Sequence, residues 1–317
     1  MGCMLLGSVS RQVLFALAAC ALCLCTSLLG CSKENAEGYF ILGLARYKKG
    51  DSVGAIADYN KAIEINPTYA EAYKNRGNVR DDLQDVDGAI ADYTKAIEIN
   101  PTYAEAYASR GFARENKGNL DGAIEDFEES LRLAPDDPSA PSVRQAVADL
   151  CLKIEINPND SWRLFYRGYA KLGKGDLDGA IADYTKVIEI NPEDAAAYHN
   201  RGLARYKKGD YDGAITDWTK AIAINPNYAA VYYSRGNARA DKGDLDGAIT
   251  DWTKAIEINP NLAAAYHNRG LARYKKGDYD GAIKDYEEFL WLAPNDLDAD
   301  KVREMIADLN LKKRLGK

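Results

Sequence analysis

The stretch AAYHNRGLARYKKGDYDGAI, from Ala196 to Ile215, decides the fold of this chain because it recurs letter for letter from Ala264 to Ile283. Looser copies lie between these two and on both sides of them. An Arg-Gly or Leu-Gly dipeptide marks the same position in every copy, and its interval is constant apart from one longer step between Gly111 and Gly168. A fixed period of about 34 residues predicts a solenoid of stacked supersecondary units.

Each copy contains two stretches of helix length with apolar periodicity, separated by a turn. In the reference copy, 195–228, we expect a first helix over about 195–208, ended by Gly209, and a second helix that is N-capped by Asp210 and stopped by Pro226. Gln84 occupies a position that is Gly in the other six copies, so we expect a left-handed backbone or an altered turn there. The copies span 36–69, 70–103, 104–137, 161–194, 195–228, 229–262 and 263–296.

This pattern resembles the tetratricopeptide repeat, a helix-turn-helix unit of about 34 residues. The resemblance covers 36–296 and implies an all-α, right-handed superhelical solenoid whose first helices line a concave groove. Arg201 and Arg205 depart from the family, which usually has Leu and Tyr at these positions. The family's aromatic, Gly, Ala, aromatic, Ala and Pro positions are Tyr198, Gly202, Ala214, Trp218, Ala221 and Pro226.

The longer step leaves residues 138–160 as a single-helix half-repeat between repeats 1–3 (36–137) and repeats 4–7 (161–296). The chain's last segment, 297–317, repeats the same sequence features, since Val302-Arg303 corresponds to Val143-Arg144. We interpret 297–317 as a C-terminal capping helix, because terminal repeats of a solenoid need a polar outer face. The middle copy is then a former cap, retained when two arrays were joined.

Acidic and basic positions recur with the repeat. Every second helix carries an Asp, and an Arg follows it at a constant offset, also within the half-repeat. Repeat 1 has Leu42 where the others have Arg, and no repeat precedes it. We therefore expect ion pairs between neighbouring repeats; the alternative is that the spacing only records duplication. The expected pairs are Asp58–Arg76, Asp92–Arg110, Asp126–Arg144, Asp149–Arg167, Asp183–Arg201, Asp217–Arg235, Asp251–Arg269 and Asp285–Arg303.

The resemblance implies a peptide-binding groove along the first helices. Aromatic side chains with spaced polar groups suit an extended peptide or a helix of a protein partner. Lys74 and Asn78 resemble the start of a carboxylate clamp, but Ser109 replaces the next Asn, so that clamp is not predicted. The groove positions are Phe40, Tyr47, Lys74, Asn78, Phe112, Phe165, Tyr169, His199, Tyr206, Tyr233, Asn237, His267 and Tyr274.

The first thirty residues differ from the rest of the chain. Arg11 precedes an uncharged, apolar run that ends Leu28-Leu29-Gly30-Cys31, which resembles a bacterial lipobox. This predicts a lipoprotein signal peptide at 1–30, lipidation of Cys31, and a tether at 31–35. An uncleaved membrane helix is the alternative, since about 20 apolar residues span a bilayer. Myristoylation at Gly2 is not favoured, because Leu6 stands where Ser or Thr is needed.

Little in the sequence predicts chemistry. The two histidines, His199 and His267, lie two repeats apart and so cannot share a metal ion. Five of the six cysteines lie at or before Cys31, which leaves Cys151 without a partner for a disulfide. We expect no enzymatic activity, cofactor or metal site. The net charge of −7, without a basic block, also argues against nucleic acid.

These features predict a non-enzymatic, membrane-tethered scaffold of the bacterial cell envelope that binds a protein partner in its groove. The alternative is a surface-exposed lipoprotein that acts as an adhesin or host-interaction factor.

Overall fold

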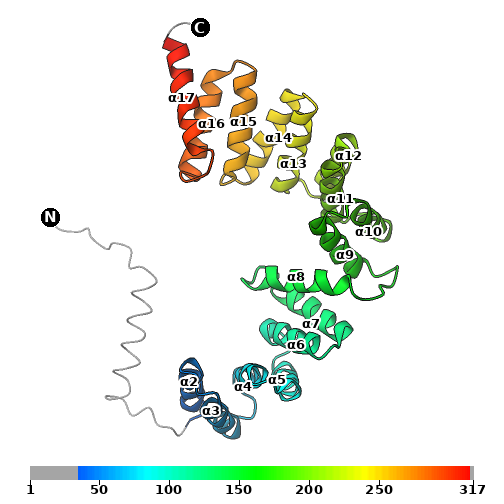
Figure 1. Ribbon diagram of the computed structural model, residues 1–317, viewed down its shortest axis with the longest axis vertical. Coiled ribbons are helices and arrows are strands. Elements are labelled where there is room, and N and C mark those ends of the chain that lie inside the picture. Colours follow the sequence, from blue (N-terminus) through cyan, green and yellow to red (C-terminus); the bar gives the residue numbers. More distant parts are fainter. Residues whose placement is uncertain (1–34, 315–317) are drawn as a thin grey trace, which may run out of the picture. The chain divides into compact units, whose positions relative to one another are not determined.

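The computed structural model describes residues 35–314, and all regular structure within them is α-helical (Figure 1). The expected signal peptide and the lipidation at Cys31 lie outside the described residues. The helices are α2 (Ala36–Lys48), α3 (Ser52–Ile65), α4 (Ala70–Asp82), α5 (Val86–Ile99), α6 (Ala104–Asn116), α7 (Leu120–Leu133), α8 (Ala140–Cys151), α9 (Ser161–Lys174), α10 (Leu177–Ile190), α11 (Ala195–Lys207), α12 (Tyr211–Ile224), α13 (Ala229–Asp241), α14 (Leu245–Ile258), α15 (Ala263–Lys275), α16 (Tyr279–Leu292) and α17 (Ala299–Arg314).

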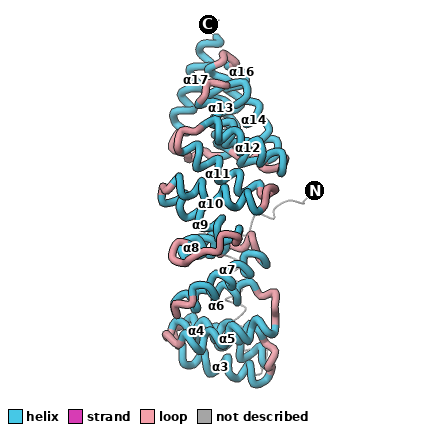
Figure 2. Tube along the Cα trace, turned by 90° about the vertical axis from the view of Figure 1, so that its right-hand side faces the viewer, coloured by secondary structure: helices cyan, strands magenta, loops and turns pink. Residues whose placement is uncertain are grey.

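The seven repeats are seven helix pairs joined by short loops, from α2–α3 to α15–α16 (Figures 1 and 2). Each second helix starts with an Asp or Asn whose side chain accepts a hydrogen bond from the backbone N–H of the third residue after it. In α12 this is Asp210, which accepts from Gly213, as the sequence predicted. A Cβ at Gly213 would lie 2.1 Å from Asp210 Oδ2, so only glycine fits beneath this cap.

Within a pair, the two helices approach closely where a glycine of the first meets an aromatic ring of the second. A Cβ at Gly202 would lie 2.5 Å from Trp218 Nε1. Trp218 is fully buried together with Ala214 and Ala221, and half-buried Tyr198 packs against this cluster. Small and large residues therefore interlock to fill the space between the two helices, which is the role the sequence assigned to these positions.

The turn between the two helices needs a left-handed residue. Six repeats have glycine there, with φ between 82° and 85°, and repeat 2 has Gln84 with φ of 64°. The expected left-handed backbone at Gln84 is therefore confirmed. A non-glycine residue in this region is sterically strained, because its Cβ approaches the backbone.

The described chain forms two compact units, residues 35–144 and 145–314, and the boundary falls inside α8. In the second unit, α17 covers the last repeat: Val302 and Leu309 are fully buried in one cluster with Tyr286 and Phe289 of α16. α8 and α17 also begin alike, because Arg144 donates to the Pro135 carbonyl and Arg303 donates to the Pro294 carbonyl. No helix within residues 35–314 is long and apolar enough to cross a membrane.

Replacing Gln84 by Gly should raise the free energy of unfolding by about 0.5–1 kcal/mol, because relief of left-handed strain exceeds the added entropy of the unfolded chain. The matched control is Gly243→Gln, which introduces the same strain where φ is 85° and should destabilise the protein. Urea denaturation of both variants measures the two changes. A decrease for Gln84→Gly would show that the glutamine is not strained.

Candidate functional site

An Arg–Asp network joins the two helices of each repeat, and repeat 6 shows it most fully. Arg235 of α13 donates two parallel hydrogen bonds to Asp251 of α14, Nε to Oδ2 at 2.9 Å and Nη2 to Oδ1 at 2.7 Å. Arg239, one turn later, donates Nη1 to the same Oδ2 at 2.8 Å. Asp251 is only 2% exposed, so this carboxylate exchanges its water shell for two guanidinium groups.

The bidentate bond recurs in six repeats, always within one repeat and always from the same position of the first helix to the same position of the second. In five of them the guanidinium also lies over the ring of a Tyr one turn before it, at 5.3 to 5.7 Å, which adds a cation–π contact. The six pairs are Arg76–Asp92, Arg110–Asp126, Arg167–Asp183, Arg201–Asp217, Arg235–Asp251 and Arg269–Asp285.

Five of these six arginines also reach the preceding repeat through their remaining nitrogen. Arg235 Nη1 donates to Thr219 Oγ1 at 3.0 Å, and Arg269 Nη1 donates to Thr253 Oγ1 at 3.0 Å. In repeat 2, Arg76 Nη1 donates to Asn60 Oδ1 at 2.6 Å. One guanidinium therefore fixes its own helix pair and also contacts the pair before it, through a neutral partner.

The expected inter-repeat ion pairs are wrong in register. Arg235 binds Asp251 and not Asp217, whose two oxygens accept from Arg201 and Arg205 of its own repeat. In a periodic sequence, the Asp before Arg235 and the Asp after it occupy the same repeat position, so spacing alone cannot separate them. The pairs that do not form are Asp58–Arg76, Asp92–Arg110, Asp126–Arg144, Asp149–Arg167, Asp183–Arg201, Asp217–Arg235, Asp251–Arg269 and Asp285–Arg303.

The ends of the array also need a different explanation. Repeat 1 has Leu42 in place of the first arginine, and its Asp58 keeps the second cation, Arg46, whose Nε lies 3.2 Å from the carboxylate. Leu42 therefore removes the bidentate bond to Asp58, and it also removes the donor that reaches the preceding pair in repeats such as 2 and 6. Asp149, in α8, accepts from Gln145 and lies 4.0 Å from Lys174.

The first helices form the inner side of each unit. Consecutive first helices contact one another, as α2, α4 and α6 do in one unit and α9, α11, α13 and α15 do in the other. Consecutive second helices within residues 35–314 make no comparable contact, so each stack is tighter on the side of the first helices. We call the surface of the first helices on this side the inner face.

In the first unit, most of the expected groove residues are engaged by neighbouring side chains. Phe40 packs on Tyr59 and Tyr69, and the Tyr47 hydroxyl donates to Asp82. The other expected residues of this unit are Lys74, which pairs with Glu105 at 2.7 Å, Asn78, which accepts from Tyr93 at 2.9 Å, and Phe112, which is 38% exposed and stacks edge-on against Phe127 at 4.8 Å.

In the second unit, most of the expected groove residues contact the side chains of neighbouring residues. Phe165 contacts Tyr184 with ring centroids 5.5 Å apart, whereas Tyr169 is 45% exposed. The two histidines have the same local sequence but different contacts, since His199 faces Tyr228 at 5.3 Å and His267 faces Phe289 at 5.1 Å. The Tyr274 ring lies beneath Lys312 at 5.6 Å.

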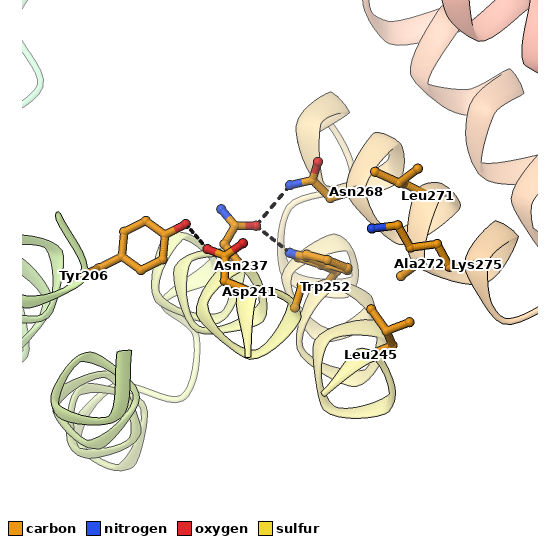
Figure 3. A pocket seen from close by; sticks show the side chains of 10 residues that line it. Tyr206, Asn237, Asp241, Leu245, Trp252, Asn268, Leu271, Ala272 and Lys275 are labelled. Atoms are coloured by element: carbon orange, nitrogen blue, oxygen red, sulfur yellow. Dashed lines mark hydrogen bonds between the residues drawn. The ribbon is translucent and has the colours of Figure 1, made fainter. Parts of the chain in front are cut away.

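Polar residues link neighbouring repeats on the inner face of the second unit (Figure 3). Tyr206 donates its hydroxyl to Asp241 Oδ2 at 2.5 Å. Asn237 Oδ1 accepts from Trp252 Nε1 and from Asn268 Nδ2, both at 3.0 Å, and Tyr233 accepts from Asn268 at 3.3 Å. These bonds hold the side chains of successive first helices in fixed positions.

Small pockets lie between these side chains. The one in Figure 3 has a volume of about 290 Å³ and is bordered by Tyr206, Asn237, Asp241, Leu271 and Lys275, among others. In the first unit, a pocket of about 280 Å³ lies beside Lys74, Ser109 and Phe112. Sites for drug-sized ligands measure about 300–1,000 Å³ and enclose most of the ligand. These pockets lie at the lower end of that range, so each has room for one side chain of a peptide.

Burial and neighbouring carboxylates alter the titration of several inner-face groups. The hydrogen bond to Asp82 and burial raise the pKa of Tyr47 to about 12, and burial followed by Asp241 raises the pKa of Tyr206. Burial lowers the pKa of His199 to about 4, so this ring is neutral near pH 7. None of these groups is poised to exchange a proton near neutral pH, and no cluster of three potential metal ligands occurs within residues 35–314.

Sequence reasoning missed several contributors to this face. The second cation of each network, such as Arg239, was visible only as a departure from the family pattern. Asp82 and Asp241 were not considered, although each lies one repeat beyond the aromatic residue that binds it. Trp162 and Tyr166 were also missed, although no other repeat has an aromatic residue at either position. Asn268 was missed as well, and its position is also Asn in repeats 2 and 5.

Sequence comparison identifies the family. Models described as TPR repeat and tetratricopeptide repeat together match residues 43–137 and 168–296. They match individually at 43–80, 168–209, 202–241, 236–277, 70–103, 263–296 and 104–137. The chain belongs to the tetratricopeptide repeat family, and its fold is an all-α solenoid of these repeats. No curated protein matches it in sequence.

Several solved structures are similar to this chain. MamA is 28% identical, with a TM-score of 0.44, over 58% of this chain and 94% of MamA. YrrB, described as "a TPR protein with an unusual peptide-binding site", is 24% identical, with a TM-score of 0.35, over 66% of this chain and 96% of YrrB. The first TPR of Spaghetti (RPAP3), bound to the HSP90 peptide SRMEEVD, is 30% identical, with a TM-score of 0.35. The match covers 37% of this chain and 93% of the Spaghetti chain.

The Arg–Asp register can be tested by two double-mutant cycles. Asp251→Ala should destabilise the protein by about 3–5 kcal/mol, because it leaves Arg235 and Arg239 without their carboxylate. In the Asp251→Ala background, Arg235→Ala should lower the free energy of unfolding much less than it does in the unaltered chain. The two substitutions should therefore show a coupling energy above about 1 kcal/mol. The matched cycle combines Asp217→Ala with Arg235→Ala, which share no hydrogen bond and should be nearly additive. Equal coupling in the two cycles would contradict this register.

Proposed function

We propose that this protein is a non-enzymatic, membrane-tethered scaffold of the bacterial cell envelope, which binds a peptide or helix of a partner protein on the inner face of its first helices. The observation that carries the binding proposal is that each unit has a small pocket on that face. Family membership supports the general class, since tetratricopeptide repeats are interaction modules. The tether rests on the sequence ending at Cys31.

Two features of the inner face favour a peptide over a small metabolite. The pockets are shallow and separate, so each can take one side chain of an extended or helical ligand. Their borders combine an apolar wall with polar groups, as Leu271 does beside Lys275 and Asn237. Because Tyr206 and Asp241 are already bonded to each other, little side-chain freedom is lost when a ligand binds.

The exposed aromatic residue Tyr169 offers the most direct test. A photoreactive benzoylphenylalanine at position 169 should crosslink to one defined protein in intact cells, and the same residue at Lys220, on a second helix, should not. The crosslink should weaken at least several-fold with Lys275→Glu, which reverses a charge in the pocket of Figure 3. Equal crosslinking from positions 169 and 220 would contradict binding on the inner face.

The tether is tested separately with the variant Cys31→Ala. We expect this variant to lose metabolic palmitate labelling and to remain as an uncleaved precursor. Palmitate labelling equal to that of the unaltered chain would rule out lipidation at Cys31. The tether would then need another explanation, and the crosslink at position 169 would stand on its own.

A further inference from the structure

Repeat 4 differs from the other repeats by an aromatic cluster at the start of its first helix. Trp162 and Tyr166 lie with ring centroids 4.6 Å apart, and Phe165 and Tyr166 lie 5.7 Å apart. These three side chains are half-buried and line a pocket of about 250 Å³ together with Asp194, Ser161 and Ala196. The corresponding residues of repeat 5 are Ala196, His199 and Asn200, so the cluster is not a general feature of the fold.

The chain itself shows what such a set of groups binds. In five repeats an arginine lies over a tyrosine ring and donates to an aspartate, as Arg235 does with Tyr232 and Asp251. The pocket of repeat 4 offers the same kinds of partner, aromatic rings and a carboxylate, but no Lys or Arg lines it. No cation in the described chain lies within ion-pair distance of Asp194.

The local charge favours a cation. Asp194 caps α11 by accepting from the Ala197 N–H at 2.9 Å, and Asp160 caps α9 in the same way. A helix N-terminus carries about half a positive charge, which one carboxylate outweighs. Asp160 is further offset by Arg163 at 3.2 Å, and Glu193 has Lys220 only at 4.0 Å. The pocket therefore keeps a net negative charge beside its aromatic rings.

We propose that this pocket binds a guanidinium group, supplied by an arginine side chain of the partner protein. Guanidinium is weakly hydrated, stacks on aromatic rings and donates hydrogen bonds in a plane, so it can use the rings and the free Asp194 oxygen together. A quaternary ammonium group would use the rings but has no N–H for the carboxylate. The source of the arginine rests on the inner-face function proposed above, whereas the pocket can be tested without any partner.

The test uses the full chain in a nonionic detergent, labelled with 5-fluorotryptophan. The chain has four tryptophans, and Trp162→Phe assigns the resonance of Trp162 in the fluorine NMR spectrum. N-acetylarginine amide should shift this resonance saturably. N-acetylcitrulline amide, which is nearly the same shape but uncharged, should bind at least about tenfold more weakly, equivalent to about 1.4 kcal/mol.

A charge-only substitution separates binding from folding. Asp194→Asn retains a good N-cap but removes the charge, and it should weaken N-acetylarginine amide about tenfold. The matched control is Asp210→Asn, the cap of α12 outside the pocket, which should leave affinity unchanged. Equal affinity for the citrulline compound, tighter binding of tetramethylammonium, or no shift at Trp162 would each overturn the proposal. Since no partner is present, these outcomes do not depend on crosslinking from position 169.

Discussion

A buried carboxylate paired with cations of the facing helix is the constraint on which the helix pairs depend, and in six of the seven repeats two cations share it. Asp251 is almost inaccessible to water, and Arg235 and Arg239 together supply three hydrogen bonds to it. Removing such a charge from water is costly, and only good geometry compensates for it. A slip of one helix along the other would leave the charge uncompensated, so the network fixes register more than it adds stability. The exposed Lys254–Glu257 pair carries no such penalty, and pairs of this kind contribute little.

This constraint explains how the inner face can vary while the fold stays constant. Arg235, Asp251 and their counterparts stay nearly the same from repeat to repeat, and they lie between the helices of a pair. The inner-face position that is Phe165 in repeat 4 is His199 in repeat 5 and Tyr233 in repeat 6. Rigid helices then present these different side chains at regular intervals, which is the arrangement that a preorganised binding surface requires. The separate pockets follow from the same alternation of residue types.

The sequence predicts the fold because the repeat supplies the same local signals seven times. The Asp210 cap, the Gly202–Trp218 approach and the left-handed turn at Gln84 depend on residues close together in one unit, and all three are found. The Arg–Asp register could not be predicted, because a periodic sequence offers each arginine two equivalent aspartates. Leu42 was the only break at the position of the first arginine, and it could not decide the register, because the arginine at this position binds its own repeat and also contacts the repeat before it. The bonds of Asn237 depend on side-chain directions that periodicity does not specify.

Repeat 1 allows the most direct test of the central claim, since it has Leu42 where the others have the first arginine. Leu42→Arg should install the missing bidentate bond to Asp58, and Leu42→Lys adds the same charge without the planar fork. Hydrogen exchange of the α3 amides measures the effect on the helix pair. The account predicts slower exchange in the arginine variant than in the lysine variant and the unaltered chain. Exchange that is unchanged or faster in the arginine variant would contradict the claim that this network fixes each helix pair.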